Sequence, residues 1–127
     1  MRVAAPTMAL LLATTLPAAA QSPLGYSQAY EHAKADEASL QGDGSGRLLE
    51  AQSRLVQSAI AACATPAADL AWFVVVAELD AGGRVVRTWR EGATPLAICF
   101  EQHTARATLF VPPRAPFYTF VEMSFTP

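Results

Sequence analysis

The stretch Trp72-Phe73-Val74-Val75-Val76-Ala77-Glu78-Leu79 is rich in β-branched and aromatic side chains, which is typical of a well-buried strand. The next four residues, Asp80-Ala81-Gly82-Gly83, tolerate the positive φ angles that a tight turn requires. From Arg84 to Arg90 the chain alternates again, with Arg87 and Trp89 on the same face. Together these segments predict a β-hairpin, and the remaining elements are interpreted around it.

Amphipathic helices are predicted on both sides of this hairpin. Apolar residues recur at steps of three and four from Arg47 to Ala64, and Thr65-Pro66 ends that pattern. After the hairpin, Thr94 is an expected N-cap with Pro95 in the first helical position. Two further strands are expected, from Thr108 to Val111 and from Phe117 to Phe125. This order of elements predicts an α+β domain over residues 47–127.

The chain contains two cysteines, Cys63 and Cys99, and each lies on the apolar face of a predicted helix. Neither belongs to a CxxC motif, so a structural disulfide is favoured over a redox pair. Closing the loop between them would stabilise the fold by about 4 kcal/mol in the loop-closure model.

Residues 1–20 are interpreted as a signal peptide, because Arg2 precedes an apolar run that ends in Pro17-Ala18-Ala19-Ala20. The run is too short to cross a bilayer, so no transmembrane anchor is expected. Cleavage near Ala20 would leave a periplasmic or secreted protein. Residues 21–46 are expected to form an N-terminal arm, with a short helix from Ser27 to Leu40 and a flexible glycine-rich linker from Gly42 to Gly46.

Composition and motifs exclude several classes of function. The formal net charge is −2, and the basic residues are not clustered, so nucleic-acid binding is not expected. No nucleophile motif, phosphate loop or metal-binding histidine pattern occurs, so we expect no enzyme activity, cofactor or metal. His103 is expected to be a hydrogen-bonded packing residue, and Glu78 is expected on an edge strand facing water.

From Leu55 onward the order of elements resembles the carboxy-terminal domain of TonB and its stand-alone relatives with two cysteines. The matching segments are the strand Phe73–Leu79, the turn Gly83-Arg84-Val85, the helix segment Pro95–Phe100 with Cys99, and Phe110-Val111-Pro112-Pro113. The resemblance implies two helices on one face of a three- to four-stranded antiparallel sheet. It also implies that an extended peptide is bound as an added strand at an open edge of the sheet.

These observations predict a non-catalytic module that binds a protein or peptide partner in the cell envelope. The candidate contact residues are aromatic or cationic: Arg87, Trp89, Phe117, Tyr118 and Phe120. Burial of the aromatic residues under the N-terminal arm is the competing interpretation. The alternative function is a small disulfide-linked inhibitor or immunity-type protein that blocks an enzyme with its hairpin tip or an aromatic loop.

Overall fold

The computed structural model describes residues 2–5, 10–13 and 23–126. The predicted cleavage site near Ala20 lies outside the described residues, as does most of the predicted signal peptide. No helix in the described ranges is long and apolar enough to cross a membrane. The elements follow in the order α1 (Tyr26–Ala38), α2 (Gly44–Cys63), β1 (Phe73–Leu79), β2 (Val85–Glu91), α3 (Pro95–Thr104) and β3 (Phe117–Met123).

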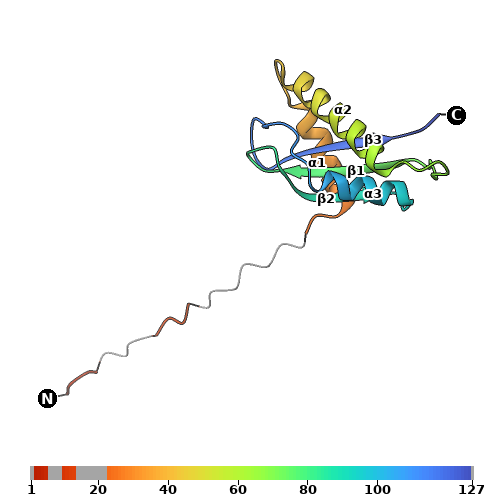
Figure 1. Ribbon diagram of the computed structural model, residues 1–127. Helices are drawn as coiled ribbons and strands as arrows, with labels where there is room; N and C mark the ends of the chain where they lie inside the picture. The colour runs from red at the N-terminus through yellow and green to blue at the C-terminus, as the bar shows by residue number, and fades with distance from the viewer. Residues whose placement is uncertain (1, 6–9, 14–22, 127) are drawn as a thin grey trace.

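The three strands form one antiparallel sheet in the order β2-β1-β3 (Figure 1). The apolar strand β1 is therefore central, which explains why its side chains are buried on both faces of the sheet. Val76 is opposite Trp89 of β2 on one side and Phe120 of β3 on the other. The predicted hairpin is confirmed, with Gly83 at a φ of +83° in its turn.

One face of the sheet is covered by α2 and α3, which confirms that part of the predicted α+β fold (Figure 1). The opposite face is covered by α1, the helix that the sequence predicted from Ser27 to Leu40 but assigned to a separate N-terminal arm. Ala29 and Ala33 of α1 are both 0% exposed and pack against Val74, Val76 and Tyr118. The N-terminal arm is thus an integral third layer, because small residues let α1 approach the sheet closely.

The glycine-rich run is not the flexible linker that was expected. Only Gly42 has a positive φ, +61°, and it lies in the short turn between α1 and α2. Gly44 and Gly46 belong to the first turn of α2, and the side chain of Leu40 lies over Gly44. The domain boundary predicted between residues 46 and 47 therefore falls inside a helix.

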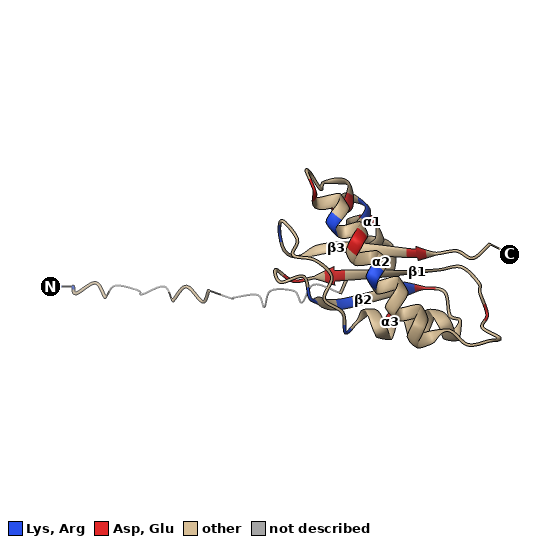
Figure 2. Ribbon diagram, turned by 45° about the horizontal axis from the view of Figure 1, so that its top comes forward, with Lys and Arg blue, Asp and Glu red and all other residues tan. Residues whose placement is uncertain are grey.

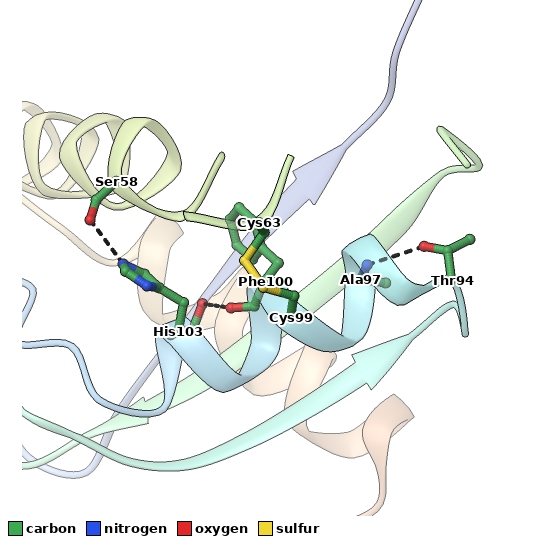
Figure 3. The surroundings of a disulfide bond; sticks show 8 residues. Ser58, Cys63, Thr94, Ala97, Cys99, Phe100 and His103 are labelled. Atoms are coloured by element: carbon green, nitrogen blue, oxygen red, sulfur yellow. Dashed lines mark hydrogen bonds between the residues drawn. A yellow bond between two sulfur atoms is a disulfide. The ribbon is translucent and has the colours of Figure 1, made fainter. Parts of the chain in front are cut away.

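The disulfide between Cys63 and Cys99 is confirmed, and it joins the end of α2 to α3 (Figure 3). Thr94 caps α3 as predicted, since its hydroxyl accepts a hydrogen bond from the Ala97 amide. Beside the disulfide, Phe73 and Phe100 pack edge to face in the core.

The strand predicted from Thr108 to Val111 is present only as a single bridge between Arg84 and Thr108. Leu109 and Phe110 enter the core, and Pro112-Pro113 follows directly, so no second strand residue continues the ladder. The final segment does form a strand, β3, with Phe117 and Val121 facing α2 and Tyr118 and Phe120 facing α1.

Candidate functional site

The outer edge of β3 is capped by carboxylates from α1. The amide of Tyr118 donates to Asp36 at 2.9 Å, and the amide of Phe120 donates to Glu37 at 2.9 Å. Side-chain oxygens thus take the place that carbonyl oxygens of a neighbouring strand would occupy. Asp36 is itself held by Arg114, whose guanidinium lies 2.7 Å from the carboxylate.

Gln52 of α2 completes this cap from the other face of the sheet. Its amide nitrogen donates to the carbonyl of Phe120 and to the hydroxyl of Thr119, both at 3.0 Å. The Thr119 hydroxyl donates to Glu37 at 2.7 Å. Burial raises the pKa of Glu37, although the hydrogen bonds from Thr119, Phe120 and Gln52 act in the opposite direction. The β3 edge is therefore closed by a connected polar network.

The outer edge of β2 has a different character. The backbone N–H and C=O of Phe120 point away from β1, so those of its partner Val76 point away from β3 and toward β2. Trp89, which is opposite Val76 on β2, therefore points its own N–H and C=O toward β1. By strict alternation, the backbone groups of Thr88 and Arg90 then point outward. Among the residues that the structure describes, no other strand pairs with β2 on that side. The edge is closed only at its beginning, where the Val85 amide donates to the Ala107 carbonyl.

Two of the five predicted contact residues lie on this open strand. Arg87 is exposed, and its guanidinium lies 5.8 Å from the centre of the Trp89 ring. Trp89 is half-buried, and its indole nitrogen donates to the carbonyl of Leu24 at 2.7 Å. Arg87 and Trp89 therefore form a cation–π contact beside the open edge, and the segment before α1 holds the Trp89 ring through its hydrogen bond.

The three aromatic residues predicted on β3 are not exposed. Phe117 is 0% exposed in the core with α2, and Tyr118 is 8% exposed beneath α1. Phe120 is partly buried against Tyr30 of α1, with ring centres 5.0 Å apart. The competing interpretation, burial under the N-terminal segment, therefore describes Tyr118 and Phe120, and neither side chain lies on an exposed surface.

Glu78 lies on the central strand, so the expectation that it faces water from an edge is wrong. Its carboxylate accepts a hydrogen bond of 2.7 Å from the Tyr118 hydroxyl. Burial and this hydrogen bond to a carboxylate raise the pKa of Tyr118 to about 12. The pair satisfies two polar groups under α1, which is a structural role.

One Ser–His contact occurs near the disulfide. The hydroxyl of Ser58 lies 2.9 Å from Nε2 of His103, in a shallow cleft between α2 and α3 (Figure 3). Within the described residues, no carboxylate is hydrogen-bonded to His103, and the oxygen and nitrogen lie on an exposed surface. His103 is hydrogen-bonded, as predicted, but it packs at the surface rather than in the core.

A groove of about 470 Å³ follows the far half of β3, between that strand and α2. Leu49, Val56 and Met123 supply apolar walls, and Glu37 and Glu122 supply carboxylates. Glu122 accepts a hydrogen bond from the Trp72 indole at 2.7 Å. Among the described residues, no three histidine, cysteine, aspartate or glutamate side chains are grouped so that they could hold a metal ion.

Sequence reasoning missed the three side chains that distinguish the edges: Asp36, Glu37 and Gln52. Each looks like a solvent-facing residue of an amphipathic helix, and Glu37 and Phe120 are 83 positions apart. No local pattern marks such a residue as a strand cap. Comparison of the chain with protein-family models, with curated proteins and with solved structures found no match.

Proposed function

We propose that this protein is a non-catalytic binding module of the bacterial cell envelope, which binds an extended segment of a partner protein along the open edge of β2. The difference between the two sheet edges supports the proposal most directly. One edge is capped by Asp36, Glu37 and Gln52, and the other leaves the backbone groups of Thr88 and Arg90 pointing outward. An added strand would pair with those groups.

The side chains of β2 would provide selectivity for the added strand. Arg87 and Trp89 face the α1 side, whereas Arg90 faces α3 and is paired with Glu101 at 3.1 Å. Neither side of the edge is uniformly apolar, so a segment that carries acidic and aromatic residues would fit Arg87 and Trp89. The disulfide and the expected signal peptide are consistent with work outside the cytoplasm, as is the resemblance to TonB-like domains inferred from the sequence.

The test is site-specific photo-crosslinking in envelope preparations. A photoreactive residue replaces Val86, which is 55% exposed on β2, and in a control it replaces Leu70, which is 52% exposed in the loop between α2 and β1. We expect a defined protein adduct from position 86 only. Thr88→Pro should abolish that adduct, because proline removes an outward donor without removing a hydrogen bond to β1. An adduct that survives Thr88→Pro, or one that forms equally at position 70, would contradict the proposal.

The same experiment separates the alternative function. An inhibitor acting through its hairpin tip would crosslink from Ala81, which is exposed in the turn, and not from Val86. Slower hydrogen exchange at the Thr88 and Arg90 amides on partner binding would support strand addition independently.

A further inference from the structure

The free part of the β2 edge is short and has defined ends. At one end, the outward amide of Val85 is already bound to the Ala107 carbonyl. At the other end, Gly92 has a φ of +104°, which is incompatible with a continued strand. The regular pairing of β2 with β1 runs without interruption from Arg87 to Glu91. Any strand added to this edge must therefore pair within these five residues.

We infer that this edge pairs with the same edge of a second copy of the chain, antiparallel and with Trp89 opposite Trp89. The inference rests on the open edge described in the proposed function and names a further partner for it. Such pairing would join two three-stranded sheets into one continuous sheet about a two-fold axis.

Backbone geometry selects this register. In an antiparallel pair, residues that face each other must both point their backbone groups toward the partner or both away from it. With Trp89 at the centre, Thr88 faces Arg90 of the other copy, and both carry outward backbone groups. A register centred on Thr88 would extend the pairing to Val85, whose amide is already bound to the Ala107 carbonyl. A register centred on Arg90 would extend it to Gly92, whose φ of +104° ends the strand.

The charges agree with the same register. Centring on Trp89 places Arg87 of each copy opposite Glu91 of the other, on the α1 side of the sheet. Both side chains are exposed, and within the described chain neither forms an ion pair of its own. Figure 2 shows positive and negative positions along the one strand β2. A centre at Arg90 would instead oppose two arginines, which is unfavourable.

Charge reversal tests the register directly. The Arg87→Glu chain carries negative charge at both positions 87 and 91, and the Glu91→Arg chain carries positive charge at both. In either variant alone, two attractive cross-strand pairs become repulsive, so the dimer dissociation constant should rise about tenfold or more. In an equimolar mixture, every 87–91 pair is again opposite in charge, so heterodimers should form with about the affinity of the original chain.

The measurement is sedimentation of the purified, oxidised protein over a range of concentrations, with a differently labelled copy of each variant for the mixture. Circular dichroism of each variant checks its fold, and recovery of the dimer in the mixture shows that both variants remain competent. A wild-type chain that stays monomeric up to its solubility limit would overturn the inference. Variants that dimerise like wild type, or a mixture that fails to associate, would overturn it as well.

Failure here is distinguishable from failure of the proposed function. If the chain is monomeric but the crosslink at position 86 is still abolished by Thr88→Pro, the edge binds a partner and does not self-pair. If the charge-swapped mixture dimerises but position 86 gives no adduct with a different protein, self-pairing is supported and partner capture is not. Where both hold, Glu91→Arg should increase partner capture, because it weakens the dimer, which occupies the same backbone groups as the partner, and leaves Arg87 unchanged.

Discussion

Along β3, the outward amides of Tyr118 and Phe120 donate to carboxylates of α1, whereas along β2 the outward groups of Thr88 and Arg90 meet no strand in the described chain. Unpaired sheet edges promote unwanted association, and proteins commonly protect them. Here the protection covers β3 but only the beginning of β2. Within the described chain, β2 is therefore the strand that keeps outward backbone groups without a strand partner, because it pairs only with β1.

The two edges also differ in how their protection is built. The β3 cap combines side chains from α1 and α2. It depends on the packing of α1 against the sheet through Ala29 and Ala33. The short closed part of β2 uses backbone bonds instead, from Val85 to Ala107 and from Leu109 to Gly83. Substitutions in the β3 cap and at the closed beginning of β2 should therefore have different effects on stability and self-association.

The largest effect on the free energy of unfolding is expected from Gly83→Ala, which disturbs the contact between the hairpin and the Ala107–Phe110 segment. An added Cβ would lie 2.2 Å from the Phe110 carbonyl oxygen, and the φ of +83° is itself unfavourable for alanine. Because the clash is with backbone, the Ala107–Phe110 segment must move away, at a cost of about 3 kcal/mol in the free energy of unfolding. Urea denaturation measures this cost, and hydrogen exchange at the Leu109 amide should become faster.

The matched control for this substitution is Gly82→Ala in the same turn. An added Cβ at Gly82 would meet only Asp80, at an ordinary 3.5 Å, so we expect a much smaller loss. Equal losses at the two glycines would show that the Ala107–Phe110 segment does not close the edge as tightly as the structure indicates.

A smaller effect is expected from Glu37→Ala, which opens the β3 edge. The substitution leaves the Phe120 amide and the Thr119 hydroxyl without their acceptor, at a cost of about 2 kcal/mol. The uncapped edge should also add a second mode of self-association, which Thr88→Pro does not remove. Glu31→Ala is the control, because Glu31 is an exposed glutamate of the same helix and pairs only with Lys34. Similar stability and association in both variants would refute the capping role of Glu37.

The sequence predicted the hairpin, α2, α3 and the disulfide because each depends on a local pattern. β-branched residues mark β1, helical spacing marks α2, and Thr94-Pro95 marks the start of α3. Cys63 and Cys99 could be paired because they were the two cysteines of the chain, on the inner faces of neighbouring helices. For these elements, tertiary structure agrees with local preference.

Burial of the aromatic residues under α1 was only the competing interpretation from the sequence, because the contact residues of this helix are small. Ala29 and Ala33 form a weak apolar pattern, yet close approach of the helix to β1 buries them completely. The β3 cap depends in turn on that approach, so Asp36 and Glu37 could not be recognised as functional or structural from spacing alone. The placement of Arg87 and Trp89 on one face could be predicted, because it follows from the alternation of a strand and does not depend on α1.

The smallest effect concerns the pH dependence of the β3 cap, and Glu37→Gln tests it. Burial under α1 raises the pKa of Glu37 above its ordinary value of 4.5, so the folded chain binds the proton more tightly than the unfolded chain. Between these two pKa values, the free energy of unfolding contributed by Glu37 falls as pH rises, and above both it is constant. Glutamine keeps an oxygen acceptor for the Phe120 amide but does not titrate. Urea denaturation at several pH values should therefore give Glu37→Gln a less negative slope than wild type in that window, whereas Glu31→Gln should follow wild type. Parallel curves for Glu37→Gln and wild type would mean that the hydrogen bonds from Thr119, Phe120 and Gln52 stabilise the carboxylate enough to offset its burial, and would contradict the raised pKa.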